Sequence, residues 1–339
     1  LMKAFTCLLL LAAPLSTQAQ LGLVLPTENT ALLSKEPAGY FQFVDRTFEG
    51  EKTTPWEGGQ FGFVRDPRRV GSRIAFARFH EGLDVKPVRR DARGEPLDEV
   101  RAIAAGQVVY VTASTGLSNY GRYIVVRHDF PGTGPFFSLY AHLKQAGVQA
   151  GDAVKAGQAI GVMGYTGAGI DQRRAHVHVE LNLLLDSQFE AWHAKNFTTP
   201  NHHGLYNGLN LIGLDLQSLY LAAEKNPALS LPEFIRSQEA AFRVRVPGTA
   251  RMEMLGRHPW LAGGKTARAA SWEVTFTRWG FPIEVLPAAE NTAAAGVTWV
   301  KDTGLPHYLN TRGLVTGSGG TGKLTVEGLR FLQLLCGLP

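Results

Sequence analysis

Apolar and polar residues alternate with a period of two in the middle of the chain, which predicts β-strands. In the segment 175–184, Val177, Val179, Leu181 and Leu183 alternate with His176, His178, Glu180 and Asn182. Residues two apart on a strand share a face, so one face of this strand is apolar and packs inward, and the other is polar. Runs of β-branched and apolar residues predict further strands at 107–112, 123–128 and 136–142.

The stretch 148–167 carries glycines between short apolar pairs, a pattern that predicts short strands joined by tight turns. Helical patterns are scarce between residues 79 and 185. We therefore expect a mostly β domain, an antiparallel sheet or barrel-like structure, over residues 75–200.

The character of the chain changes after residue 186. Helical patterns occur at 189–195, 214–225, 231–242 and 325–335, and strand patterns at 271–277, 283–286 and 297–300. We expect residues 205–339 to form an α+β region, whose role the sequence does not indicate. For its tryptophans, core packing is the commoner explanation and glycan binding the rarer one: Trp260, Trp272, Trp279 and Trp299.

Residues 1–19 resemble a secretory signal peptide. Lys3 gives a positive start, Leu8 to Ala13 form a short apolar run, and Pro14 breaks it. We therefore predict that the mature protein is secreted or periplasmic. Residues 20–74 are expected to be a leader or linker followed by a β-rich lead-in. No apolar run approaches the 18 or more residues of a membrane span, so none is predicted.

Composition narrows the function only slightly. The 339 residues are 45% hydrophobic, which is enough for a core, and the formal net charge is +5. No clustered basic stripe is evident along the chain, so we do not predict a nucleic-acid partner. Cys336 is the one cysteine beyond the leader, so no internal disulfide is expected. No pattern indicates an oligomeric state.

His80 and Asp84 are the first candidate metal ligands. In a straight strand they would lie about 13 Å apart, too far for one ion, so the chain must bend between them. Gly82 makes such a bend easy. The segment is not the helical H-E-x-x-H motif, because its fifth position is an aspartate, so Glu81 does not inherit the role of general base.

His176 and His178 form a second candidate pair, and His142 a third segment. On a strand the two histidines share a face about 7 Å apart, so one ligates the metal and the other lies beside it in the cleft. His142 follows Tyr140 at the end of a predicted strand. A lone histidine is usually structural, and we interpret His128, His193, His258 and His307 in that way, with His202 and His203 as loop residues.

Together these segments resemble the lysostaphin/LytM-type zinc metallopeptidases, a family with the pattern H-x-x-x-D, then Y-x-H-L, then H-x-H. The matching residues are His80 to Asp84, Tyr140 to Leu143 and His176 to His178. The glycine-rich segment from Ala150 to Gly167 also resembles the glycine-rich stretch of this family. The resemblance covers about residues 75–185, a third of the chain.

The resemblance implies an antiparallel β core with an open groove. It also implies one Zn²⁺ ion held by His80, Asp84 and His178, with His142 and His176 as the catalytic pair. The sequence does not decide which of those two is the general base. The implied activity is a zinc endopeptidase that hydrolyses peptide bonds in peptidoglycan, in either stem or cross-bridge peptides. The chain departs from the family in a charged insertion between Asp84 and Val100, which we expect to border the groove.

Two other functions remain open at this stage. The same fold serves a non-catalytic protein that binds the wall or activates another hydrolase, which a properly folded but zinc-free protein would favour. A two-histidine, one-carboxylate set also suits a non-haem iron oxygenase, although the extra histidines and secretion fit that poorly. The glycine-rich segment 317–324 resembles a phosphate loop but has Leu324 where Ser or Thr is needed, so we interpret it as a flexible turn.

Overall fold

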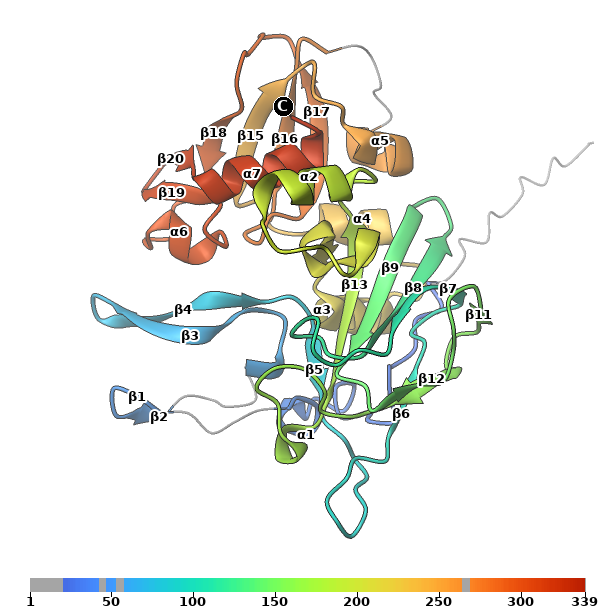
Figure 1. Ribbon diagram of the computed structural model, residues 1–339. Coiled ribbons are helices and arrows are strands. Elements are labelled where there is room, and N and C mark those ends of the chain that lie inside the picture. Colours follow the sequence, from blue (N-terminus) through green and yellow to red (C-terminus); the bar gives the residue numbers. More distant parts are fainter. Residues whose placement is uncertain (1–20, 43–46, 53–57, 264–268, 339) are drawn as a thin grey trace, which may run out of the picture.

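A large antiparallel sheet occupies the lower part of the molecule in Figure 1, and a smaller sheet with helices occupies the upper part. This computed structural model describes residues 21–42, 47–52, 58–263 and 269–338. The predicted signal peptide, residues 1–19, lies outside the described residues. A mostly β fold with a C-terminal α+β region was predicted, and the structure confirms it.

The main sheet is antiparallel, with the strand order β11-β7-β8-β9-β13-β14, and β5 also pairs with β13. Its strands are β5 (Leu83–Val85), β7 (Gly106–Thr112), β8 (Tyr123–Phe130), β9 (Gly134–Ala141), β11 (Ala153–Val154), β13 (Val177–Leu184) and β14 (Leu211–Gly213). The predicted strands at 107–112, 123–128, 136–142 and 175–184 are all present, although β13 begins one residue after His176.

A three-stranded sheet flanks the main sheet in the order β10-β12-β6. It consists of β6 (Glu99–Arg101), β10 (Gln145–Ala146) and β12 (Ala159–Val162). Two of the short strands from the glycine-rich stretch, β11 and β12, thus join different sheets. Gly151 and Gly157 have positive φ angles of 100° and 77°, which explains why the turns around them carry glycine.

A long hairpin precedes the main sheet and projects to the left in Figure 1. It is formed by β3 (Gly62–Val70) and β4 (Arg73–His80), after α1 (Pro37–Tyr40), β1 (Thr47–Phe48) and β2 (Glu51–Lys52). The segment 20–74 was expected to begin with a leader or linker, but in its described part Leu21, Leu32, Tyr40 and Phe41 are buried in the core. The apolar side chains of this segment therefore pack into the core, and the segment is not a free linker.

The C-terminal region, here the described residues from 205 onward except β14, which belongs to the main sheet, contains a four-stranded sheet in the order β17-β16-β15-β18. The strands of that sheet are β15 (Phe242–Pro247), β16 (Ser271–Phe276), β17 (Pro282–Ala288) and β18 (Gly296–Val300), while β19 (Val315–Ser318) and β20 (Thr321–Leu324) pair with each other. Its helices are α3 (Leu216–Lys225), α4 (Leu231–Arg236), α5 (Glu253–Arg257), α6 (His307–Asn310) and α7 (Val326–Cys336), and α2 (Phe189–Asn196) precedes it.

One predicted helix, 231–242, is too long. α4 begins with a capping box between Ser230 and Glu233 but ends at Arg236. Ser237 donates its hydroxyl to the Phe234 carbonyl, and the chain then enters β15 at Phe242. In β15 the buried Val244 and Val246 alternate with arginines, a period-two pattern that overrides the helical one.

The glycine-rich segment 317–324 lies in an antiparallel hairpin rather than in a flexible turn. Val315 to Ser318 pair with Leu324 to Thr321, and Gly319 and Gly320 form the turn between them. Thr325 then caps α7. A phosphate loop needs a strand that leads directly into the loop and then the helix, so this topology agrees with rejecting one.

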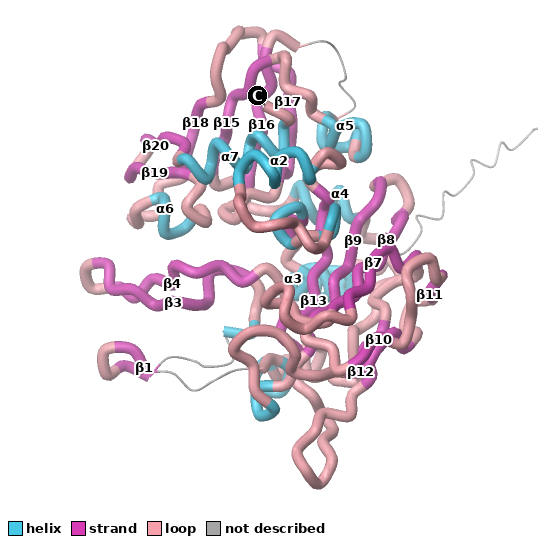
Figure 2. The backbone as a smooth tube through the Cα atoms, viewed as in Figure 1, coloured by secondary structure: helices cyan, strands magenta, loops and turns pink. Residues whose placement is uncertain are grey.

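The two parts of the molecule share one hydrophobic core, which contains Val179 of the main sheet and Val274 of the upper sheet. Side-chain hydrogen bonds reinforce the contact. Arg257 donates to the carbonyls of Leu184 and Leu185, Trp260 to that of Thr133, and Trp279 to that of Gly213. All eight residues of β13 are buried, so its polar face is covered as well as its apolar face. The tube in Figure 2 shows this stacking of the two parts.

Across the described ranges, no helix has both the length and the apolar character that crossing a membrane requires.

Candidate metal centre

The chain bends between His80 and Asp84, as their spacing predicted. β4 ends at His80, β5 begins at Leu83, and Gly82 lies between them. A Cβ on Gly82 would lie 2.5 Å from the Val179 carbonyl oxygen of β13, so only glycine fits there. β5 pairs with β13 in the register that puts Asp84 opposite His178.

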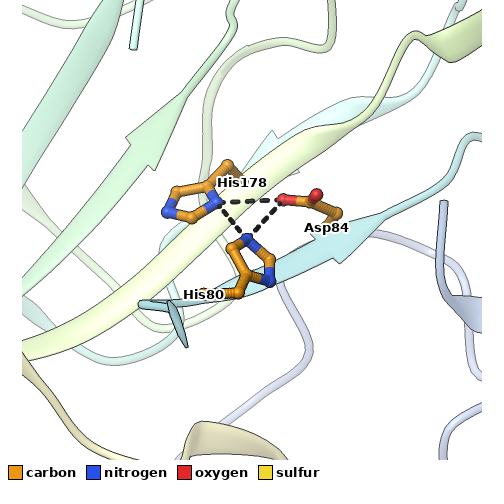
Figure 3. A group of neighbouring side chains, drawn as sticks. All are labelled: His80, Asp84 and His178. Atoms are coloured by element: carbon orange, nitrogen blue, oxygen red, sulfur yellow. Dashed lines mark hydrogen bonds and ion pairs between the residues drawn. The ribbon is translucent and has the colours of Figure 1, made fainter. Parts of the chain in front are cut away.

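His80, Asp84 and His178 converge on one point, as Figure 3 shows. Asp84 Oδ1 lies 3.0 Å from His80 Nε2 and 2.9 Å from His178 Nδ1, and these two nitrogens are 3.0 Å apart. All three side chains are buried. Ligand atoms around a tetrahedral zinc with bonds of about 2.0–2.1 Å lie roughly 3.3 Å apart, so the spacing suits such an ion.

The hydrogen bonds on the far side of each ring fix which nitrogen faces the centre. His80 Nδ1 donates to the Gln60 carbonyl oxygen at 2.7 Å, and His178 Nε2 donates to Glu180 Oε1 at 2.7 Å. A neutral ring then turns its lone pair inward, so two nitrogen lone pairs and a carboxylate oxygen meet within about 3 Å. Such a group is stable only with a cation, either a proton or a metal ion, between its atoms. The donor set therefore fits a metal.

Glu180 is a residue whose role the sequence did not reveal. It is 1% exposed, and its carboxylate also accepts hydrogen bonds from the Tyr120 hydroxyl at 2.7 Å and from Asn182 Nδ2 at 2.9 Å. A carboxylate behind a ligating histidine orients the ring and raises its basicity. The signal was present in the sequence, because Glu180 is two residues after His178 and so shares its face of the strand.

Arg65 is a second residue that the sequence did not reveal. Its guanidinium bonds to Asp84 Oδ2 at 2.5 Å, while Oδ1 faces the two histidines. Burial raises the pKa of Asp84, but His80, His176 and Arg65 outweigh burial and hold that pKa well below its usual range. The carboxylate is therefore ionised whenever the protein is folded near neutral pH.

The two carboxylates around His178 make its surroundings strongly favourable to positive charge. Burial lowers the pKa of His178, but its hydrogen bonds to Asp84 and Glu180 outweigh burial and raise the pKa to about 10. The same field favours a metal cation at Nδ1 in place of a proton. Metal binding would then release that proton, which couples metal affinity to pH.

His142 and His176 lie beside this centre with their ring centroids 4.7 Å apart. His142 Nδ1 donates to the Thr166 carbonyl oxygen at 2.9 Å, and His176 Nδ1 donates to that of Arg174 at 2.6 Å. Both Nε2 atoms are thereby left for other partners, and that of His176 lies 3.4 Å from Asp84 Oδ1. Burial and the two neighbouring histidines hold the pKa of His142 well below 6.5.

His142 also has an unusual backbone. Its φ angle is 63°, in the left-handed region that residues with a side chain rarely adopt. Hydrogen bonds from its amide to the Tyr120 carbonyl and from its ring to Thr166 hold it there. Residues held in this way are concentrated at functional sites, because the surrounding structure must hold the strained conformation in place.

A cleft of about 1290 Å³ opens over these five residues. Tyr120 and Asn119 line it together with residues of the C-terminal region: Trp279, Arg312, Leu314, Phe331 and Leu334. The region whose role the sequence did not indicate therefore forms part of the wall of the cleft. The charged insertion does not border it as expected. Arg90 of that insertion bonds to the carbonyls of Gln172 and Arg173, and no residue from 89 to 98 lines the cleft.

The histidines interpreted as structural lie apart from the centre. His128 bonds to Ser138 and the Ala105 carbonyl, and His258 to the Thr133 carbonyl. His307 is fully buried, and His193 packs against Phe189 and Phe197. His203 differs, because it lines the far end of the cleft and bonds to the Tyr110 hydroxyl at 2.8 Å.

Comparison with known proteins covers the same part of the chain. The profile described as "Peptidase family M23" matches residues 78–188. "Lipoprotein NlpD" of Yersinia enterocolitica is 38% identical over 76 residues, which cover 22% of this chain and 69% of that protein. "Lipoprotein NlpD/LppB homolog" of Pseudomonas aeruginosa is 34% identical over 91 residues, 27% of each chain. The match thus spans about a quarter of that relative.

Among solved structures, the catalytic domain of lysostaphin from Staphylococcus simulans is similar over 46% of this chain and 85% of that chain, with 23% identity and a TM-score of 0.26. The matched family segment, residues 78–188, contains His80, Asp84, His142, His176 and His178. The Yersinia relative is 38% identical to this chain over 69% of its own length. The chain therefore belongs to peptidase family M23.

Proposed function

We propose that this protein is a zinc-dependent endopeptidase that hydrolyses peptide bonds in bacterial peptidoglycan. The observation that carries the proposal is the convergence of three inward-facing ligand atoms, from His80, Asp84 and His178, next to two histidines with available Nε2 atoms. Membership of family M23 supports a peptidase that acts on the cell wall.

His80 through Nε2, Asp84 through Oδ1 and His178 through Nδ1 would hold the metal. When bound, zinc supplies an acidified water and a Lewis acid for the scissile carbonyl. Three protein ligands would leave a position open for water or substrate, as in other catalytic zinc sites. Glu180 and Gln60 keep the two rings turned toward the ion.

His142 is the general base in this proposal. Its pKa is low, so the ring is neutral near pH 7, and its Nδ1 is occupied by Thr166. Its Nε2 can therefore accept the proton of the attacking water and pass it to the leaving amine. His176 lies beside His142, with the two ring centroids 4.7 Å apart and its Nε2 3.4 Å from Asp84 Oδ1, so its ring can help to position the attacking water and the substrate.

We further propose that the protein acts in the cell envelope, after removal of residues 1–19. The curated relatives carry names such as "Lipoprotein NlpD" and "Outer membrane antigenic lipoprotein B". A wall polymer is too large to enter a small closed pocket, and the cleft over the candidate metal centre has a volume of about 1290 Å³. An extended peptide would lie in it with the cut bond above His178.

The test is digestion of isolated peptidoglycan by the purified protein, with and without zinc, followed by mass spectrometry of the soluble fragments. Zinc-dependent release of peptide-cleaved fragments, lost in Asp84→Ala and His142→Ala, is expected. Asp84→Ala should also lose the metal, whereas His142→Ala should retain it. Retained zinc with no fragments from any wall type would instead support a non-catalytic wall-binding or hydrolase-activating protein.

A further inference from the structure

The β3–β4 hairpin is rich in arginine. Residues 62–80 contain five arginines and a single acid, Asp66: Arg65, Arg68, Arg69, Arg73 and Arg78. Pairing of the two strands brings these side chains, which are spread along the sequence, onto one arm beside the metal centre. The arm thus carries a concentrated positive charge that was not evident along the chain.

Four of these arginines have partners. Arg65 pairs with Asp84, Arg68 with Asp66, and Arg69 with Glu49 and Glu51. Arg73 donates to the Gly304 carbonyl. Arg78 is the exception, because its exposed side chain has no hydrogen bond or ion pair to any described residue.

Arg78 faces the cleft beside the metal centre. It lies two residues before His80 on β4, so the two side chains share a face of the strand, with backbones about 7 Å apart. Arg78 is also directly opposite Arg65 in the hairpin register, and both line the cleft. Like charges directly opposite each other on paired strands are destabilising. Of these two arginines, only Arg65 forms an ion pair, with Asp84.

Among the described residues that line the cleft, no acid is free to pair with Arg78. The acidic side chains that line the cleft each have an arginine already: Asp66 with Arg68, Glu81 with Arg312, Asp84 with Arg65, and Glu327 with Arg330. An unpaired guanidinium that lines a cleft beside a second arginine is a favourable binding site for an anionic group of a ligand.

We propose that Arg78 binds a carboxylate of the peptide substrate, and so selects acidic peptides over neutral ones such as glycine chains. The inference rests on the proposed function and names the substrate class of that cleft. A guanidinium presents two parallel N–H donors to a carboxylate, and this fork geometry gives specificity as well as affinity. The spacing from His80 places the bound carboxylate within one to three residues of the cut bond.

The experiment compares two labelled pentapeptides, Ala-Ala-Glu-Ala-Ala and Ala-Ala-Gln-Ala-Ala, blocked at both ends. Their binding to the zinc-loaded protein is measured by fluorescence anisotropy, and the recovered peptide is checked by mass spectrometry for cleavage. The protein should bind the glutamate peptide about 10- to 100-fold more tightly, since a charge-assisted hydrogen bond is lost with glutamine. Arg78→Gln should abolish that preference, and Arg78→Lys should retain part of it.

Arg73→Gln is the matched control, because Arg73 lies on the same hairpin, does not line the cleft and bonds to the Gly304 carbonyl rather than to an acid of the cleft. It should keep the full preference. Zinc is present in every protein compared. A preference for the glutamate peptide that persists in Arg78→Gln would therefore show that the carboxylate binds the metal, and this result would overturn the proposal. Equal binding of the two peptides by the parent protein would overturn it as well. If the parent protein prefers the glutamate peptide but never cuts wall peptides, the carboxylate site at Arg78 is supported and the proposed peptidase activity is refuted.

Discussion

The metal centre and the C-terminal region both bury histidines, but the buried rings meet different partners. His178 lies between two carboxylates, Asp84 and Glu180, and its pKa is raised to about 10. His258 is equally buried but bonds to the Thr133 carbonyl, and burial lowers its pKa to about 4. Burial alone disfavours the cation, so it is the partner that makes a buried histidine a site for positive charge.

The two regions also divide the cleft between them. The sheet supplies converging nitrogen and oxygen atoms that favour a cation, whereas the C-terminal region supplies apolar side chains and charges that are already paired, such as Arg312 with Glu81. Chemistry is therefore expected to depend on the sheet, and the shape of the cleft on the C-terminal region. The predictions below test this division, from the largest effect to the smallest.

Replacing Asp84 with alanine should have the largest effect. The change removes the oxygen that lies 3.0 and 2.9 Å from the two ring nitrogens and leaves a site without an anionic ligand. Bound zinc, measured by equilibrium dialysis and emission spectrometry, should fall from one ion per chain to none, and peptide release should fall at least about 100-fold. His258→Gln, in the C-terminal region, should keep one ion. Loss of zinc from both variants would show that the two histidine environments do not differ in their importance for metal binding.

Glu180→Gln should weaken zinc binding about 10- to 100-fold, the usual range for a partner behind a ligating histidine. Glutamine keeps the shape of the side chain but removes the negative charge that raises the basicity of His178. A competition titration with a chromogenic chelator would measure the change. Glu81→Gln is the matched control, because Glu81 pairs with Arg312 and not with a ring. Equal affinities in the two variants would show that charge behind the ring is unimportant.

The convergence of the candidate ligands could be predicted from the sequence because these residues are close along the chain or lie on one strand face. His80 and Asp84 are four residues apart around a glycine, and His176 and His178 follow a period of two. The ion pair of Arg65 with Asp84 could not be predicted in this way. It depends on the hairpin register, in which a bulge between Phe63 and Arg65 shifts the pairing.

The C-terminal region shows what patterns along a sequence cannot give. Most of its strands and helices follow their apolar periods, but nothing in those periods tells which surface of another sheet they cover. That Trp279 and Phe331 line the cleft follows from tertiary packing between segments about 100 residues or more from the site histidines. The burial of Leu21, Leu32, Tyr40 and Phe41 could not be predicted for a similar reason, because apolar side chains in an irregular segment carry no period.

The buried neutral histidines predict how stability depends on pH. The folded pKa of His258, about 4, lies below the unfolded value near 6.5, so the unfolded chain binds more protons between these values. The free energy of unfolding should therefore decrease as the pH falls through this window, by about 2 kcal/mol for this residue between pH 7 and pH 5. Urea unfolding of the parent protein and of His258→Gln would measure it. A variant whose pH dependence matches that of the parent would contradict the assignment.

Trp279→Phe should have the smallest effect, at the contact between the two regions. Trp279 donates from Nε1 to the Gly213 carbonyl at 3.0 Å, and its ring packs against Phe61 and Phe79. Phenylalanine keeps most of the packing and removes the donor, so unfolding should become easier by about 1 kcal/mol. Urea denaturation measures this, with Trp299→Phe as the control in the same region, because residue Trp299 is 39% exposed.

The same variant also tests whether the wall of the cleft is held in place by this hydrogen bond. Gly213 pairs with Asn182 in the main sheet, and Asn182 in turn bonds to Glu180 behind the metal centre. A loosened wall should weaken peptide binding while zinc affinity stays constant, because the ligands belong to the sheet alone. A fall in zinc affinity instead would mean that the C-terminal region positions the ligands as well as the wall, and the division between the two regions would fail.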